Sequence, residues 1–404
     1  MIRDQHPASS SGRWAALLLA FFLFPGLSLA GAEAGAGSFT GENPLGVQRA
    51  EFAATQVGMD LIYQRRYAEA LEHFEEMYID FPDSPVGPIG RGLVYQAQMF
   101  ENYDFSRERS YRTEFAEAQT RLARALKKSP HPEWIAFLHA VHLGVDAMYD
   151  VRRRRFLSAF DKAWDALEEI KNIQRKTPAF ADADLGLGLY NYWRTVITER
   201  VSVLPAFGDK RAEGLAQMRN ARENGFLAKA PASFALSYSL IERGDLKGAI
   251  KEGERTQVEY PGSVLNAMTL AQAHRKAKDY PQALSILEGI RQKHPQNTRV
   301  WFQIAEVHYK SRKKNSEAEA AYLEYLKADP PTDYRAYTYY RLGQLEQRAR
   351  DYSAAIQWYE KALKAQPKLK QAKKRLEDAR EAMERHETRP KQGVRRRPNA
   401  ERAG

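Results

Sequence analysis

Residues 279–283 read DYPQA, and residues 351–355 read DYSAA. In both stretches the final alanine is followed by an apolar residue after four positions, another after seven and a proline after twelve. The two sets are Ala283, Leu287, Ile290 and Pro295, and Ala355, Tyr359, Ala362 and Pro367. A small residue and larger apolar residues at helical spacing predict a helix packed closely on an antiparallel neighbour, and the proline ends that helix. Each stretch therefore predicts a pair of helices.

The same offsets recur through most of the chain, at intervals of about 34 residues where nothing is inserted. The small residues that begin the further sets are Ala70, Ala118, Ala166, Gly214, Ala249 and Ala318. This pattern resembles the tetratricopeptide repeat over about residues 51–385. The resemblance implies an all-α fold, a right-handed α-solenoid of about eight helix pairs with a C-terminal capping helix over residues 369–384. Such solenoids present extended concave surfaces that bind other chains.

Departures from the pattern suggest internal divisions. Extra residues in the second and third repeats predict enlarged loops, around residues 101–111 and at the arginine run 152–155. The fourth repeat is atypical: Gly186 and Gly188 favour close helix contact there, and Gly225 is expected to end its second helix in a left-handed conformation. We expect a signal peptide at 1–32, a linker at 33–50, N-terminal repeats with enlarged loops at 51–180, an atypical central repeat at 181–229, regular repeats with the capping helix at 230–385 and a disordered basic tail at 386–404.

The N-terminus predicts export. Arg3 and Arg13 precede an apolar run at residues 14–24, and small residues follow Pro25 at residues 28–32. This order is typical of a cleaved signal peptide, and a bacterial periplasmic location fits best. Secretion, or anchoring by an uncleaved N-terminal segment, stays an alternative. The chain has no cysteine, which excludes disulfides and a lipid-anchored bacterial lipoprotein.

The composition is that of a folded, basic protein. Apolar residues make up 43% of the chain and charged residues 28%, a balance that favours a globular fold over disorder, and the formal charge is +11. Part of this charge lies in Arg395, Arg396 and Arg397, which suggests peripheral contact with an anionic membrane or polymer. Nucleic acid is not an expected partner, because no aromatic residues lie between these arginines to stack on bases.

The resemblance also implies a binding surface. In this family the first helix of each repeat lines a concave groove that holds a peptide or a partner helix. The positions that match are Met268, Gln272, Arg275, Phe302, Gln303, Glu306, Tyr309, Lys310, Tyr337, Tyr340, Arg341, Gln344 and Arg348. Aromatic, cationic and amide side chains suit a peptide that carries carboxylates and one or two apolar anchors. The alternative is that the tyrosines pack between helices and the arginines are only solvated.

A second cluster of aromatic and basic residues follows Gly188. It consists of Tyr190, Tyr192, Trp193, Arg194 and Arg200. We expect this cluster to be a secondary docking site, or a hinge between an N-terminal and a C-terminal half of the solenoid. A buried wedge between repeats is an equally good interpretation.

Nothing in the sequence predicts catalysis. His139, His142 and Asp146 could share one helix face and hold a metal, but no His-Glu-X-X-His motif and no Gly-X-Ser-X-Gly motif is present. Packing explains the histidines better, so we expect no metal, no cofactor and no catalytic residue. The predicted function is a non-enzymatic scaffold that holds protein partners of the bacterial envelope. The alternative is a subunit that recognises an anionic envelope polymer or lipid head groups through its basic and aromatic surface.

Overall fold

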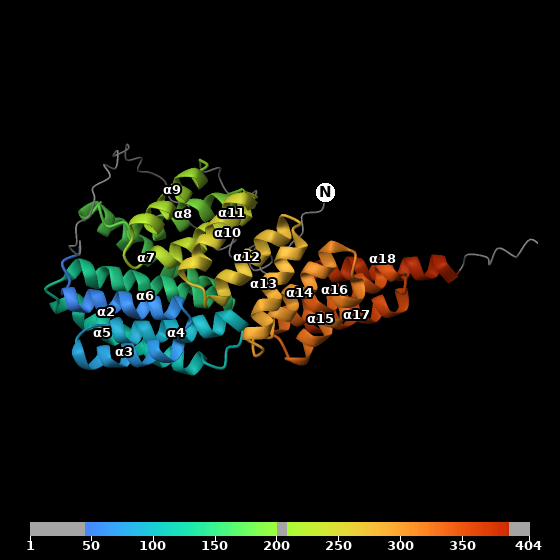
Figure 1. Ribbon diagram of the computed structural model, residues 1–404, viewed down its shortest axis with the longest axis horizontal. Coiled ribbons are helices and arrows are strands. Elements are labelled where there is room, and N and C mark those ends of the chain that lie inside the picture. The colour runs from blue at the N-terminus through green and yellow to red at the C-terminus, as the bar shows by residue number, and fades with distance from the viewer. Residues whose placement is uncertain (1–44, 200–207, 388–404) are drawn as a thin grey trace, which may run out of the picture. The chain divides into compact units, whose positions relative to one another are not determined.

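The computed structural model describes residues 45–199 and 208–387, and within these ranges the regular secondary structure is helical throughout (Figure 1). The predicted signal peptide at 1–32 lies outside the described residues. So do residues 33–44 of the predicted linker, almost all of the predicted tail at 386–404, and the site residues Arg200, Arg395, Arg396 and Arg397.

The described residues form helices that follow one another with short turns. Their bounds are α2 Arg49–Tyr63, α3 Tyr67–Asp80, α4 Val86–Asn102, α5 Glu108–Lys128, α6 Pro132–Arg152, α7 Phe156–Lys176, α8 Ala183–Thr198, α9 Arg211–Asn224, α10 Lys229–Arg243, α11 Leu246–Glu259, α12 Val264–Lys276, α13 Tyr280–Lys293, α14 Arg299–Ser311, α15 Asn315–Lys327, α16 Thr332–Ala349, α17 Tyr352–Ala365 and α18 Lys370–Glu387. Residue contacts divide the chain after Ser311 into two compact units, which we name the first unit and the second unit.

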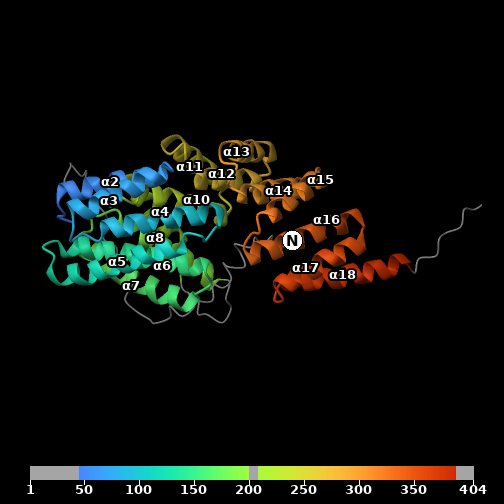
Figure 2. The same ribbon diagram turned by 90° about the horizontal axis from the view of Figure 1, so that it is seen from below.

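Neighbouring helices pack in pairs, as the repeat pattern predicts. Figure 2 shows α2 to α7 as rods lying side by side, and each packs on the next along the chain. The predicted small and large apolar residues form the contacts: Ala283 and Leu287 are buried, and so are Ala355 and Tyr359. In the second unit α18 packs on α17 through Ala372 and Ala379, as expected of the capping helix. The structure therefore confirms a helical repeat fold.

The extra residues of the second and third repeats lengthen helices. The sequence pattern predicts enlarged loops around residues 101–111 and 152–155. Residues 103–107 do form a turn between α4 and α5, but most of the extra residues lie in helices, since α5, α6 and α7 each have 21 residues. The turn between α6 and α7 is only residues 153–155. The insertions keep an apolar stripe at helical spacing, with Ala159, Ala166 and Ile173 buried along α7. The additional turns can therefore bury side chains of their own.

The central repeat depends on close backbone contact between α8 and α9. A Cβ atom on Gly188 would lie 2.7 Å from the carbonyl oxygen of Gly214, and one on Gly214 would lie 2.6 Å from the carbonyl oxygen of Gly188. This confirms the expected close contact for Gly188, whereas Gly186 has ordinary spacing. The expectation for Gly225 was wrong, because its φ of −68° and ψ of 155° are extended.

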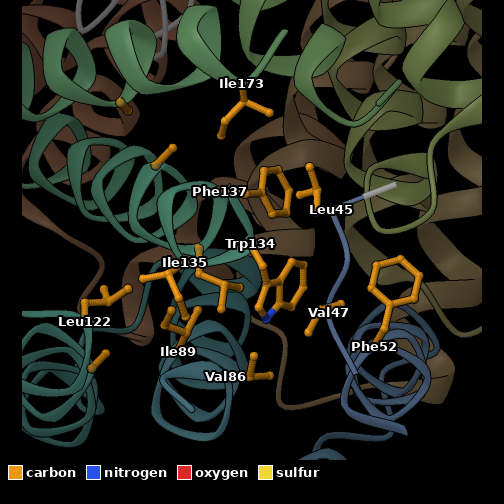
Figure 3. Close-up of a cluster of buried hydrophobic side chains, with 14 of the residues drawn as sticks. Leu45, Val47, Phe52, Val86, Ile89, Leu122, Trp134, Ile135, Phe137 and Ile173 are labelled. Carbon is orange, nitrogen blue, oxygen red and sulfur yellow. The ribbon is translucent and has the colours of Figure 1, made fainter. Parts of the chain in front are cut away.

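The core of the first unit includes the segment that precedes α2. Leu45 and Val47 are buried in one hydrophobic cluster with Phe52, Trp134 and Phe137. Figure 3 shows Leu45 beside Phe137, and Val47 between Trp134 and Phe52. Residues of the first and third repeats therefore pack on this short N-terminal segment.

The first repeats also contact much later repeats of the first unit. The rings of Phe52 and Phe226 lie 5.5 Å apart, and those of Tyr63 and Phe234 lie 5.9 Å apart. At the C-terminal end of α4, in the second repeat, Asn102 Oδ1 accepts a hydrogen bond from the backbone N–H of Arg299 at 3.1 Å. The first two repeats of the first unit thus contact repeats that lie far later in the sequence.

Candidate functional site

The predicted groove residues of the first unit lie on α12 and α14, which pack on each other. Arg275 Nη1 of α12 lies 3.6 Å from Glu306 Oε2 of α14, and both side chains are buried. Most of the set is buried, whereas Gln272 and Lys310 are partly exposed; the buried members are Met268, Arg275, Phe302, Gln303, Glu306 and Tyr309. This part of the predicted surface is therefore a packed face with a buried ion pair.

In the second unit, the predicted groove residues lie on one face of α16. Spacings of three and four residues place Tyr337, Tyr340, Arg341, Gln344 and Arg348 on one side of this helix. The Arg341 guanidinium lies 4.7 Å from the ring centre of Tyr337, and its Nη1 donates to Gln344 Oε1 at 2.9 Å. Gln344 Nε2 in turn donates to the Tyr340 hydroxyl at 3.0 Å. Arg348 is exposed and Gln344 is half-buried, whereas the other three are buried.

These contacts fix the side chains of the α16 face. Two aromatic rings, an amide and a guanidinium hold one another through stacking and hydrogen bonds. The ring of Tyr340 also lies 6.0 Å from that of Tyr359 on α17, which ties the face to the second helix of the pair. The half-buried Gln344 amide is thus already ordered, so a ligand that binds it causes less loss of side-chain entropy.

The structure separates the members of the Tyr190 cluster. Tyr192 is fully buried, and its hydroxyl donates to the carbonyl oxygen of Ser239 at 2.7 Å, so it packs between repeats. Tyr190, Trp193 and Arg194 are partly exposed. Arg194 lies 5.3 Å from the centre of the Tyr190 ring. The cluster therefore has a packed half and a half that reaches the surface.

Sequence reasoning missed two residues of α7 that extend this surface. Lys171 Nζ lies 5.6 Å from the ring centre of Tyr190 and 5.7 Å from that of Trp164. Trp164 is 37% exposed, although tryptophan is usually well buried. Trp164, Lys171, Tyr190 and Arg194 thus form an alternating row of rings and cations, which we name the α7–α8 ladder. The available signal was a tryptophan outside the apolar stripe of its helix.

The arginine run between α6 and α7 contacts other side chains of the first unit. Arg153 Nη2 lies 3.2 Å from Glu108 Oε2, and Arg155 Nε lies 3.0 Å from Asp150 Oδ1. The Arg152 guanidinium lies 5.4 Å from the ring centre of Tyr103. Much of the charge in this run is therefore balanced within the protein.

The histidines of α6 lie in two different environments. His139 Nδ1 lies 2.6 Å from Glu169 Oε1, whereas the His142 ring stacks on Phe115 at 4.6 Å. Burial lowers the pKa of His142 to about 4, so this imidazole is neutral at pH 7. Within residues 45–199 and 208–387, no three side chains of the metal-binding types are grouped to hold an ion.

In residues 45–199 and 208–387, no helix combines the length and apolarity needed to cross a bilayer.

Comparison with known sequences identifies the repeats. Two sequence models, both described as tetratricopeptide repeat, match residues 274–338 and 336–369. The matched residues include the DYPQA and DYSAA stretches and the α16 face. The C-terminal part of the chain therefore carries tetratricopeptide repeats. Among curated proteins, no sequence matches this chain significantly.

Solved structures resemble this chain in fold at low sequence identity. The human IFIT1 dimer with PPP-AAAA has 13% identity and a TM-score of 0.53 over 85% of this chain and 87% of that one. The human IFIT1 dimer with m7Gppp-AAAA has 13% identity and a TM-score of 0.52 over 96% and 87%. The APC/C hetero-tetramer Cut9–Hcn1 has 13% identity and a TM-score of 0.52 over 80% of this chain and 54% of that one. These likenesses show a helical solenoid of the tetratricopeptide-repeat type.

Proposed function

We propose that this protein is a non-enzymatic scaffold of the bacterial envelope that binds peptide segments of partner proteins on the first helices of its C-terminal repeats. Tetratricopeptide repeats generally form protein–protein interaction scaffolds and are typically non-enzymatic. The observation that carries the proposal is the α16 face, where Arg348 is exposed and the half-buried Gln344 is held in place by the buried Arg341. An exposed guanidinium beside an ordered amide suits a carboxylate of a bound peptide.

The closed core of the first unit supports the second unit as the main binding region. Leu45 and Val47 already fill the space between the first repeats and Trp134 and Phe137. The proposed surface also includes the groove residues on α12 and α14, of which Gln272 and Lys310 are accessible. Binding at α12 and α14 would have to use these two side chains or rearrange the buried pair of Arg275 and Glu306.

Capture of partners from native envelopes tests the proposed surface. We compare the wild type with Tyr340→Phe/Arg341→Gln, which removes one hydroxyl and one charge but keeps the side-chain size. The matched control is Tyr339→Phe/Arg335→Gln, which changes the same residue types on the opposite side of α16. Crosslinking should recover a discrete set of proteins with the wild type and the control and lose it with the first variant. Equal recovery by all three, with equal thermal stability, would reject the α16 face.

The envelope location rests on residues 1–32. Mass spectrometry of the protein purified from its native cell should show a mature chain that begins near residues 31–33. A chain that retains Trp14 and fractionates with the cytoplasm would reject export.

A second candidate function is supported by the α7–α8 ladder. Half-exposed rings that alternate with cations suit the sugar faces and acidic groups of an anionic envelope polymer. Binding to purified polymer should then weaken steeply with salt and with Trp164→Ala. Saturable binding to one protein at moderate salt supports the scaffold instead.

A further inference from the structure

A polar cleft of about 390 Å³ lies in the first unit, and none of its lining residues belongs to the α16 face or the α7–α8 ladder. It lies where α2 meets α9, α10 and α11, so it exists because the first repeat contacts the fourth and fifth. Its lining residues are Asp60, Gln64, Arg222, Glu223, Lys229, Arg255, Glu259 and Tyr260. This volume is within the range of clefts that hold small molecules.

One wall of the cleft is closed by direct contact between distant turns. A Cβ atom on Gly262 would lie 2.5 Å from the carbonyl oxygen of Gln64, so only glycine allows the two backbones to approach so closely. Next to this contact, the Tyr260 ring lies 5.8 Å from that of Tyr63, and the Tyr260 hydroxyl donates to Asp60 Oδ1 at 3.4 Å. Residues about 200 positions apart in the sequence therefore form one fixed wall.

Ion pairs order the other side chains of the cleft. The Arg222 side chain is only 3% exposed. Its Nε donates to Glu252 Oε1 at 2.7 Å, and its Nη2 donates to Glu259 Oε2 at 2.7 Å. Arg255 Nη2 donates to Glu223 Oε2 at 2.9 Å. Because three glutamates pair with these two arginines, the pairs fix the shape of the cleft and leave no uncompensated positive charge on either arginine.

Two charged side chains at the cleft form no salt bridge. Among the described residues the Lys229 side chain is in no hydrogen bond or salt bridge, although its charge acts on Glu223 of the same cleft, and the Asp60 carboxylate accepts only from the Tyr260 hydroxyl. Lys229 is at the start of α10, whereas Asp60 is near the end of α2, and both are exposed. The cleft therefore offers one accessible ammonium and one accessible carboxylate outside its salt bridges.

We propose that this cleft binds a small zwitterion of the α-amino acid class, with its carboxylate on Lys229 and its ammonium on Asp60. The three basic and three acidic residues of the lining balance each other, which favours a ligand without net charge over phosphate or a polycation. The ion pairs hold Arg222 and Arg255 in place. Lys229 and Asp60 therefore set the orientation of the ligand.

Binding of free amino acids to the full chain tests the proposal. Ligand-observed NMR with each free L-α-amino acid should identify at least one that binds, and calorimetry then compares that compound with its N-acetyl form and its amide. The N-acetyl form lacks the ammonium and the amide lacks the carboxylate, so each should bind about tenfold more weakly or worse. Failure of every amino acid to bind at millimolar concentration would overturn the proposal.

Two variants at exposed positions assign each charge to its residue. Asp60→Asn should remove the advantage of the free amino acid over its N-acetyl form, and Lys229→Gln should remove its advantage over the amide. Lys247→Gln is the matched control, since Lys247 is exposed on α11 and does not line the cleft. If neither preference changes in the two variants, the ligand does not lie between Asp60 and Lys229 and the proposal is wrong.

Discussion

At the scale of single residues, buried polar side chains hold distant parts of the first unit together. Asp182 is almost fully buried between α7 and α8, and its carboxylate accepts hydrogen bonds from the backbone N–H groups of Phe226, Leu227 and Ala228. These donors precede α10, so one side chain fixes the turn between the fourth and fifth repeats. Its removal leaves the donors without partners.

Asp182→Ala should therefore lower the free energy of unfolding by about 3 kcal/mol or more, since each buried donor without a partner costs about 1–3 kcal/mol. Urea denaturation measures this loss. Asp184→Ala is the control, because Asp184 is only partly buried and accepts from the side chains of Gln174 and Asn220. A loss for Asp182→Ala no larger than that of the control would contradict the role of the buried carboxylate.

His142 should make the stability of the first unit depend on acid. Burial lowers its pKa to about 4, below the ordinary 6.5, so the unfolded chain binds a proton first as the pH falls. The free energy of unfolding should thus decrease from pH 6.5 to pH 4, by up to about 3 kcal/mol. His142→Phe keeps the ring beside Phe115 and should flatten this dependence. An equally steep decrease in the variant would show that other groups cause it.

At the scale of helices and turns, two local features mark the start of the second helix in three of the repeats. The aspartates at 245, 279 and 351 each cap the helix that follows: Asp245 accepts from the N–H of Gly248, Asp279 from that of Gln282 and Asp351 from that of Ala354. Just before these caps, Gly244, Lys278 and Arg350 have positive φ values of 90°, 66° and 65°. Only the first of these residues is the glycine that this conformation favours.

Lys278→Gly and Arg350→Gly should consequently stabilise the fold by about 0.5–1 kcal/mol each, because glycine removes the left-handed strain at a modest entropic cost. Thermal and urea unfolding measure the change. Ala277→Gly is the matched control, since Ala277 has a right-handed helical conformation and glycine there should destabilise. If all three substitutions lower stability alike, the turns are not strained.

The sequence predicts these elements because their signals are local. Small and large apolar residues four and seven apart suffice to place α13 and α17, and the helix over residues 369–384 is found as α18. Local signals also misled in part, because a repeat of fixed length has no place for longer helices. The loop predicted around 101–111 is found as a turn at residues 103–107, but the one predicted at 152–155 is only a short turn between two lengthened helices. Gly225 was misjudged for a similar reason, since glycine also serves close approach; a Cβ there would lie 2.4 Å from the Ala221 carbonyl oxygen.

At the scale of the whole molecule, the chain has two compact units, and the N-terminal segment belongs to the core of the first. Leu45→Ala/Val47→Ala should lower the stability of the first unit by about 3 kcal/mol or more, because buried side chains are lost from a packed cluster. Hydrogen exchange should speed up in α2 and α6 and stay unchanged in α16 to α18. Equal acceleration in both units would mean that they unfold together.

The candidate sites were only partly predictable, because sequence patterns report local contacts and not contacts between distant repeats. The members of the α16 face could be placed together from the sequence because they lie on one helix, at spacings that the sequence displays; their role in binding stays a prediction. Tyr192 was placed in a docking cluster although it packs between repeats, and Lys171 was missed although it stacks on Tyr190. The polar cleft joins Asp60 to Tyr260, and no local pattern reports contacts over that separation.

The measurement that tests the central claim most directly is photo-crosslinking from single positions of α16 in the native envelope. A photoreactive residue at position 344 or 348 should crosslink to a discrete partner protein, whereas one at position 335 or 339, on the opposite side of the helix, should not. Crosslinks from 335 and 339 alone, or no protein crosslink from any of the four positions, would contradict a scaffold that binds its partners through this face.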